Sequence, residues 1–170
     1  YNQVKSMWAG DSLKETLNYT LTDKNGESKS LQATVTINGE NSGVKGIETD
    51  TISISEANGT YEGRLSVVAE DKGVLSYQIK VFDVDLGKEV ILSTNGATAK
   101  TAYGELTFFT NGSYTFRPNG SLQEGVSESL DFQYKGILTN GDKTQNANPA
   151  EGWTDVNIDI TGVNDAPYII

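Results

Sequence analysis

Apolar and polar residues alternate along much of this chain, with the period of two that predicts β-strands with one buried and one exposed face. The clearest case is residues 154–161, where Val156, Ile158 and Ile160 alternate with polar residues. Apolar stripes with helical spacing are hard to find, so the pattern predicts an all-β protein. Further strands are predicted at residues 13–21, 31–37, 65–69, 74–82, 90–92, 103–108, 112–119 and 130–134. Six alternating aromatic residues are predicted to form core and cross-strand pairs: Tyr103, Phe108, Tyr114, Phe116, Phe132 and Tyr134.

Turn signals separate the predicted strands. The dipeptide Asn-Gly, a strong signal for a tight turn between strands, occurs seven times, and Asn111-Gly112 predicts a hairpin. After the last strand, Gly162 ends the alternation. Pro167 lacks an N–H group and restricts the residue before it, so the chain is predicted to leave the sheet in an extended conformation.

The end of the chain repeats a segment near its beginning. Residues 12–19 parallel residues 126–132, and residues 35–41 parallel residues 158–164, so the sequence holds two copies of the end of a module but one copy of its beginning. About 43 residues in two or three strands are too few to bury a core. The first copy is therefore truncated, split from distant strands, or completed by residues 46–68, and the sequence leaves these alternatives open. The predicted organisation is a partial sandwich at 1–43, a linker and edge strand at 44–64, a complete module at 65–167, and the start of a further linker or module at 168–170.

Composition narrows the possible functions. The formal net charge of −10 disfavours nucleic acid, because no basic stripe is available to displace counterions from phosphates. No stretch approaches the roughly 18 apolar residues of a membrane span, which argues against membrane insertion. Cysteine and histidine are absent, which removes disulfides, thiolate chemistry, Ser-His-Asp triads and the usual zinc sites. We therefore expect a protein that is not an enzyme.

Several motifs taken together resemble the VCBS/cadherin-like repeats of large RTX-type bacterial surface adhesins. They are EDKG at 70–73, DVDLG at 83–87, YGELTF at 103–108, NGSYTFRPN at 111–119, GVSESLDFQY at 125–134 and TGVNDAP at 161–167. The resemblance covers residues 65–167 in full and residues 8–41 as a C-terminal half. It implies an immunoglobulin/cadherin-like antiparallel β-sandwich, tandem arrays, type I secretion to the extracellular bacterial surface, calcium near module joints, and a role in biofilm formation. The first copy departs from the pattern, because Glu40-Asn41-Ser42-Gly43 replaces Asn-Asp-Ala-Pro.

Acidic residues in turns are the candidate calcium ligands. Calcium takes roughly six to eight oxygen ligands, so several carboxylates must converge. Asp83 and Asp85 lie two residues apart in a turn that ends at Gly87, and the resemblance adds a position at Glu128. The alternative is that these residues cap backbone N–H groups of ordinary turns. The predicted metal ligands are Glu70, Asp71, Asp83, Asp85, Glu128, Asn164 and Asp165, with Asp11 and Asp23 as a comparable pair in the first copy.

One long loop is a candidate recognition surface. Leu17 to Val35 spans 18 positions, whereas the matched Leu130 to Ile158 spans 28, so the second copy carries ten extra residues. Loops on sandwiches often carry recognition. The candidate ligand-binding residues in the loop 140–153 are Asp142, Asn146, Asn148 and Trp153. The alternative is a tolerated surface insertion whose Trp153 lies on the sandwich edge.

These observations predict a non-catalytic, calcium-stiffened spacer module of a secreted bacterial adhesin, whose partners are neighbouring repeats of the same polypeptide. The alternative is a ligand-binding or split-domain scaffold module that recognises a host or biofilm glycan or protein. A thermal melt with and without calcium would separate the two.

Overall fold

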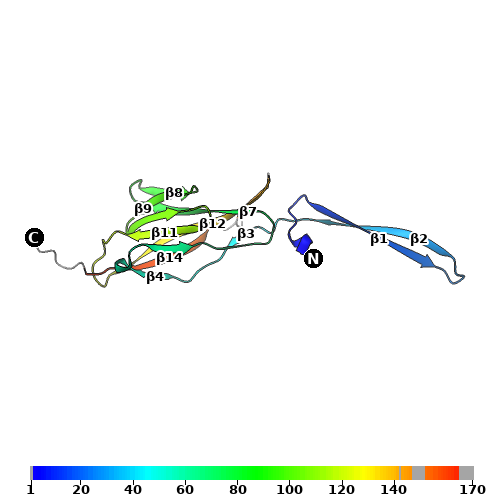
Figure 1. Cartoon of the computed structure of the whole chain (residues 1–170), viewed down its shortest axis with the longest axis horizontal. Coiled ribbons are helices and arrows are strands. Elements are labelled where there is room, and N and C mark those ends of the chain that lie inside the picture. The colour runs from blue at the N-terminus through cyan, green and yellow to red at the C-terminus, as the bar shows by residue number, and fades with distance from the viewer. Residues whose placement is uncertain (1, 142, 147–151, 165–170) are drawn as a thin grey trace, which may run out of the picture. The chain divides into compact units, whose positions relative to one another are not determined.

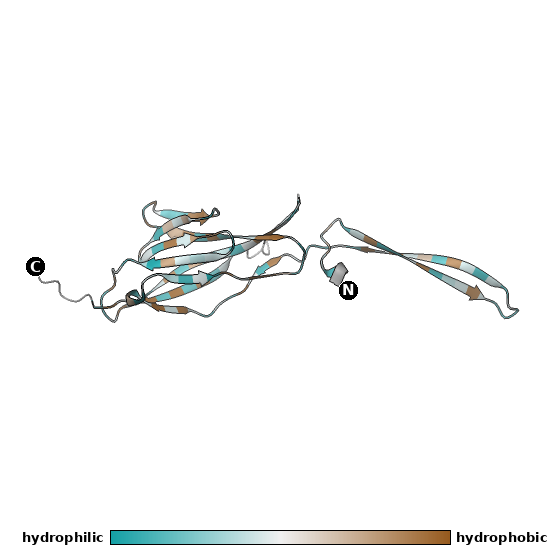
Figure 2. Cartoon of the chain, in the orientation of Figure 1, coloured by the Kyte–Doolittle hydropathy of each residue, from teal (hydrophilic) through white to brown (hydrophobic). Residues whose placement is uncertain are grey.

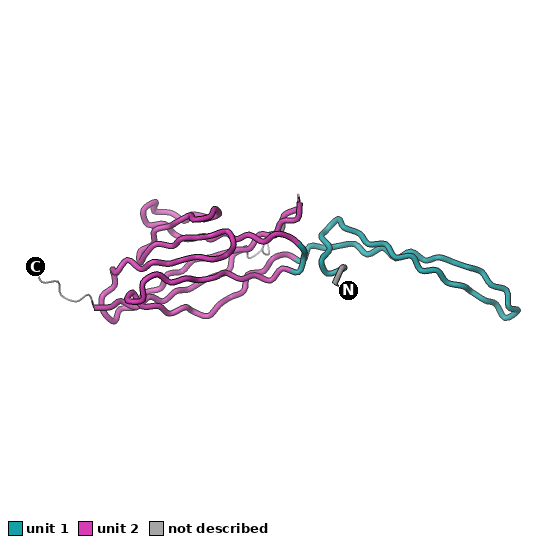
Figure 3. The backbone as a smooth tube through the Cα atoms, viewed as in Figure 1, with its two compact units in different colours: residues 1–42, 70–72 teal, residues 43–69, 73–170 magenta. Residues whose placement is uncertain are grey.

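The computed structural model describes residues 2–141, 143–146 and 152–164, and its chain forms two compact units (Figure 3). Unit 1 comprises Tyr1–Ser42 and Glu70–Lys72, and unit 2 comprises Gly43–Ala69 and Gly73–Ile170. Among the described residues, no helix is both long enough and apolar enough to cross a membrane. The residues 168–170 that we predicted to begin the next segment lie outside this description.

Unit 1 is built on one long β-hairpin (Figure 1). After the short helix α1 (Asn2–Lys5), strands β1 (Ser12–Thr22) and β2 (Ser28–Asn38) pair antiparallel over 11 residues each. The turn between them is closed by Asp23, whose Oδ1 accepts the N–H groups of Asn25 and Glu27 at 2.8 and 2.9 Å. Hydrogen bonding of this kind is what Asp contributes to turns generally.

Unit 2 is a β-sandwich of two main sheets, as the alternating pattern predicts. The first sheet has the order β5-β11-β10-β9 and contains β5 (Tyr61–Arg64), β9 (Ala97–Thr101), β10 (Gly104–Phe108) and β11 (Ser113–Pro118). The second has the order β4-β14-β12-β7-β8 and contains β4 (Ile52–Ser55), β7 (Val74–Asp83), β8 (Lys88–Leu92), β12 (Ser127–Asn140) and β14 (Thr154–Thr161), with β13 (Lys143–Asn146) paired to β12. A small third sheet joins β3 (Val44–Gly46) to β6 (Val67–Ala69), and a 3-10 turn η1 covers Glu56–Asn58. All these pairings are antiparallel except that of β4 with β14.

The core of unit 2 lies between its two main sheets. Apolar residues alternate with polar ones along these strands (Figure 2), and the apolar set faces inward. Leu106 and Phe116 of the first sheet and Ile79, Ile158 and Ile160 of the second are 0% exposed. Tyr114 packs edge-on against Phe132, with ring centroids 5.3 Å apart. The predicted all-β sandwich with an aromatic core is confirmed.

Two segments contain more β-strands than we predicted from the sequence. The predicted linker and edge strand at 44–64 lie in unit 2 and form β3, β4 and β5, of which β4 and β5 are sheet edges. The predicted loop 140–153 contains β13, which pairs with the end of β12 over Ile137–Asn140. This pairing arises because β12 continues beyond the residues that oppose β14, so its backbone groups find a partner across the turn at Gly141.

Candidate functional sites

The sandwich of unit 2 ends with a contact between residues 122–126 and Gly162, which we call the closing motif. The N–H of Val126 donates to the carbonyl oxygen of Gln123 at 3.0 Å, and the N–H of Gly162 donates to Val126 at 2.8 Å. A Cβ atom on Gly162 would overlap the Gln123 carbonyl oxygen and lie 2.8 Å from the Cβ of Leu122. Gly125, with φ of 76°, makes the turn. Only glycine allows the chain after β14 to pass this segment.

Unit 1 ends with the same arrangement of backbone groups. The N–H of Asp11 donates to the Trp8 carbonyl oxygen at 2.9 Å, and the N–H of Gly39 donates to Asp11 at 2.9 Å. A Cβ atom on Gly39 would overlap the Trp8 carbonyl oxygen and lie 2.8 Å from the Cβ of Met7. Gly10, with φ of 94°, makes the turn. The sequence repeat is therefore a repeat of structure.

The strand register corrects one of the two sequence matches. Ile158 pairs with Leu130 in unit 2, whereas Val35 pairs with Glu15 in unit 1. The match of Val35 with Ile158 holds, but Leu17 corresponds to Phe132 and the earlier match of Leu17 with Leu130 is wrong by two residues. A shift of two keeps every side chain on the same face, so the pattern alone does not detect it. The second copy carries eight extra residues, where the sequence match predicted ten.

Trp8 anchors the end of unit 1 to the loop Glu70–Lys72. Its side chain is 1% exposed, and its Nε1 donates to the carbonyl oxygen of Lys72 at 2.8 Å. Its backbone N–H donates to Asp11 Oδ2 at 2.9 Å. Lys5 and Glu70 form a half-exposed ion pair at 3.9 Å. Trp8 was not predicted as a functional residue, and the available signal was a bulky aromatic side chain two residues before Gly10.

Asp71 is the buried carboxylate of this end. Asp71 is only 5% exposed, and its Oδ2 accepts the N–H of Ser42 at 3.0 Å. Close by in the sequence, Asn41 accepts the N–H of Ala9 through Oδ1 at 2.9 Å. Asn41 is the repeat equivalent of Asn164. Unit 1 thus contains the predicted ligands Asp11, Glu70 and Asp71, together with the amide oxygen of Asn41.

The Asp83 carboxylate is held by backbone groups. Its Oδ1 accepts the N–H of Leu86 at 3.0 Å and its Oδ2 accepts the N–H of Lys100 at 3.1 Å. The Leu86 hydrogen bond is the main cause that holds the pKa of Asp83 below its ordinary value. Asp85 lies on the surface and pairs with the Lys100 ammonium at 3.3 Å. The contacts of Asp83 match the alternative that this turn uses an aspartate for capping.

The remaining predicted ligands are Asp23, Glu128, Asn164 and Asp165. Asp23 caps the hairpin turn, and Glu128 is an exposed residue of β12. Burial is the main cause that raises the pKa of Tyr103, and the charge of Glu128 raises it further. Asn164 is exposed, and Asp165 lies outside the described residues. Across residues 2–141, 143–146 and 152–164, no three acidic side chains lie close enough together to form a metal site. The predicted metal ligands are divided between the two units, and Asp83, Asp85, Glu128 and Asn164 lie in unit 2.

Trp153 lies beside two lysines of the second sheet. The Nζ atoms of Lys80 and Lys135 each lie 4.8 Å from the centre of its ring. The side chain is neither fully buried nor fully exposed. Asp142 and Asn148 lie outside the described residues, and Asn146 is the last residue of β13. The ring therefore has protein contacts of its own, in keeping with the alternative of a surface insertion.

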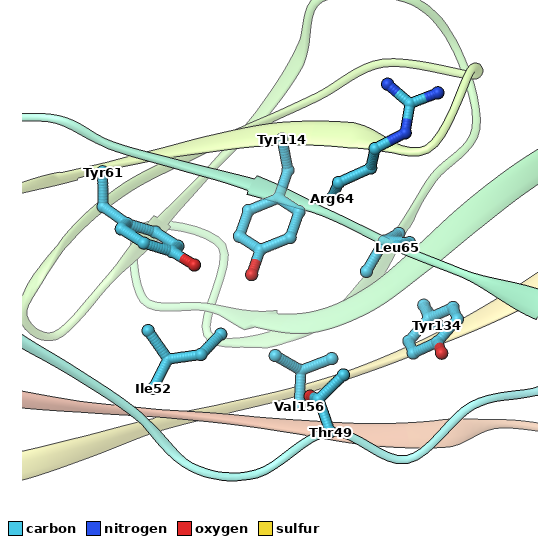
Figure 4. A pocket seen from close by; sticks show the side chains of 8 residues that line it. All are labelled: Thr49, Ile52, Tyr61, Arg64, Leu65, Tyr114, Tyr134 and Val156. Atoms are coloured by element: carbon cyan, nitrogen blue, oxygen red, sulfur yellow. The ribbon is translucent and has the colours of Figure 1, made fainter.

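A cavity of about 200 Å³ lies between the sheets of unit 2 (Figure 4). Tyr61, Tyr114 and Tyr134 line it together with Ile52 and Arg64. Burial raises the pKa of Tyr114 and of Tyr134, so these phenols stay neutral and act as hydrogen-bond groups. Tyr114 and Tyr134 were predicted as core residues, but the cavity was not, because its lining comes from strands distant in the sequence.

The lining of this cavity contains no carboxylate. The hydroxyl of Tyr134 accepts the N–H of Ile47 at 3.0 Å and lies 2.7 Å from the carbonyl oxygens of Ile47 and Ser66. These contacts fasten the segment before β4 to the core, so Tyr134 has a structural role. The cavity combines aliphatic side chains with phenol groups and the guanidinium of Arg64.

Neither a scan against protein-family models nor a search of curated proteins finds a match to this chain. Function is therefore inferred from the residues and their geometry. Two features stand out among the described residues: the closing motif that occurs twice, and the buried Asp71 carboxylate of unit 1.

Proposed function

We propose that this chain is part of a tandem array of β-sandwich modules and acts as a non-catalytic spacer of an extracellular bacterial adhesin. The observation that carries the proposal is the closing motif, in which Gly39 packs on Trp8 as Gly162 packs on Gln123. Two copies of such a motif in one chain are what a tandem repeat produces. The resemblance to VCBS/cadherin-like repeats supports the adhesin context, and the acidic surface suits an extracellular, cation-rich setting.

Calcium is the proposed stiffening ion, and the end of unit 1 is its proposed position. Asp71 and Asp11 supply carboxylates and Asn41 supplies an amide oxygen, which are the ligand types calcium prefers. Asp71 is the most buried of these three residues, at 5% exposed. The turn at Asp83 is left out of the proposal, since Asp83 and Asp85 come from one short turn and an ion bound by them would not link distant segments of the chain.

When bound, calcium supplies a cross-link between residues far apart in the sequence and neutralises their charges. An ion that binds only the folded state at 100 times its dissociation constant stabilises that state by about 2.7 kcal/mol. Such a contribution is a large fraction of the stability of a small domain. The spacer would therefore be stiff in calcium-rich surroundings and loose without calcium.

A thermal melt of the full chain tests this proposal. We expect a higher Tm in millimolar calcium than in excess EGTA, with magnesium much less effective. Asp71→Asn should remove the calcium-dependent difference, whereas the exposed control Asp85→Asn should keep it. If calcium leaves the Tm of the wild type unchanged, the calcium part of the proposal is wrong. If Asp85→Asn alone removes the effect, the ion belongs at the turn 83–87.

A further inference from the structure

The hairpin β1–β2 has one apolar face and one polar face. Register places Leu17 opposite Ala33 and Tyr19 opposite Leu31, all on one face. The other face carries only Ser, Thr, Asn, Gln and Lys side chains. The apolar face consists of Leu13, Leu17, Tyr19, Leu21, Leu31, Ala33, Val35 and Ile37, interrupted by Glu15 and Lys29.

Much of this apolar face is open to solvent. Leu17 is 56% exposed, Leu21 58%, Val35 47% and Tyr19 46%. A two-stranded hairpin is marginally stable by itself in water, and contiguous exposed apolar surface usually marks an interaction site. The alternating pattern is typical of a strand pair with one buried face, so we expect other residues to cover the apolar face of this hairpin.

The repeat identifies what covers such a face. By the register above, Leu17 corresponds to Phe132 and Val35 to Ile158 in unit 2. Phe132 is 3% exposed and Ile158 is 0% exposed, because the sheet β5-β11-β10-β9 packs over them. Tyr114 of that sheet contacts Phe132 directly. The equivalent pairs are Leu17 and Phe132, Tyr19 and Tyr134, Ala33 and Val156, Val35 and Ile158, and Ile37 and Ile160.

We infer that the hairpin β1–β2 is the closing half of another β-sandwich. Its occupant is a four-stranded antiparallel sheet with an apolar inner face, equivalent to β5-β11-β10-β9, carried by polypeptide outside residues 1–170. The inference rests on the tandem-module part of the proposed function and is independent of calcium.

One observation favours this occupant over a second copy of the hairpin. In unit 2 the equivalent face meets four strands, whereas a second hairpin offers two. Leu17 and Ala33 are also smaller than Phe132 and Val156, so the missing sheet should carry larger residues opposite them.

A fusion protein tests the inference. A second copy of residues 43–121, which contains the covering strands, is joined directly before Tyr1 of the full chain. Amide hydrogen exchange is then measured in β1 and β2, with the unfused chain as reference. We expect exchange in these strands to slow at least tenfold in the fusion. The same fusion with Leu17→Phe and Ala33→Val, which restores the side chains of unit 2, should slow it further.

Matched substitutions separate covering of the face from a general effect of fusion. In the fusion, Leu17→Asp should abolish the added protection, whereas Thr16→Asp on the polar face should preserve it. The added segment lacks closing strands of its own, so its folding depends on the hairpin. An added segment that stays unprotected in both fusions, or a hairpin whose exchange is unchanged, overturns the inference.

Sedimentation of the unfused chain provides the second measurement. A monomer at micromolar concentration is expected. A dimer that Leu17→Asp dissociates would show that a second copy is the occupant and would overturn the inference. Such a dimer leaves the calcium-dependent melt of the proposed function unaffected, so the two failures are distinguishable.

Discussion

Gly39 lies so close to Trp8 that a Cβ atom added to the glycine would overlap the tryptophan carbonyl oxygen. The neighbouring Met7 Cβ would lie 2.8 Å away, which is also closer than packed carbon atoms approach. Both opposing atoms belong to the backbone or adjoin it, so a change of rotamer does not relieve the overlap. Gly162 has the same relationship to Gln123, and both contacts close a strand pair.

Gly162→Ala is expected to destabilise unit 2 by about 1–3 kcal/mol, the usual cost of forcing extra atoms into a packed site. The added methyl group would displace the segment Leu122–Gln123 from the end of β14. Urea denaturation measures the loss, with the exposed Glu124→Ala as control. Equal midpoints for the two variants would show that the segment moves freely and that the glycine is not required.

Gly63→Ala should destabilise the edge of the first sheet by a similar amount, about 1–3 kcal/mol. A Cβ atom there would overlap the ring of Tyr114, which lies directly over the glycine backbone. In a Tyr114→Leu background the same substitution should cost much less, because the ring is gone. A double-mutant cycle in urea gives the coupling, and a coupling near zero would contradict the assignment.

Asp83 should make folding sensitive to acid. Its pKa is lowered in the folded state, so its contribution is fully present above the unfolded value of about 4 and is lost as pH falls through the folded pKa. The wild type is therefore expected to be more stable than Asp83→Asn at pH 7, and the difference should shrink as the pH falls below the unfolded value.

The measurement is a series of urea midpoints across this pH range. Asp85→Asn serves as the control, since Asp85 is exposed and pairs only with a surface ammonium in the contacts described. A stability difference for Asp83→Asn that is constant with pH would indicate that the charge of Asp83 is not what holds the Leu86 and Lys100 N–H groups.

Trp153→Ala should lower the stability of unit 2 through loss of its contacts with Lys80 and Lys135. Each cation–π contact at a surface contributes about 0.5–1 kcal/mol, so a loss of about 1–2 kcal/mol is expected. Lys135→Met keeps the stem of the lysine and removes its charge. A double-mutant cycle without coupling between Trp153 and Lys135 would show that the ring does not use this cation.

Local pattern predicted the fold class and much of the core. Val156, Ile158 and Ile160 alternate as they do because β14 has one buried face, and this periodicity can be read from neighbouring residues alone. The hairpin at Asn111-Gly112 was equally local, and β10 and β11 pair around it. These predictions hold because a strand and a tight turn depend on residues close together in the sequence.

Only the tertiary structure decided what each acidic residue contacts and how the repeat aligns. Asp71 is buried and accepts the N–H of Ser42, while Asp83 accepts the N–H groups of Leu86 and Lys100, and turn aspartates look alike in the sequence. The register of β1 differed by two residues from the sequence match, since such a shift leaves the alternation intact. Contacts between residues distant in the chain depend on tertiary packing, which the local pattern of apolar and polar residues does not determine.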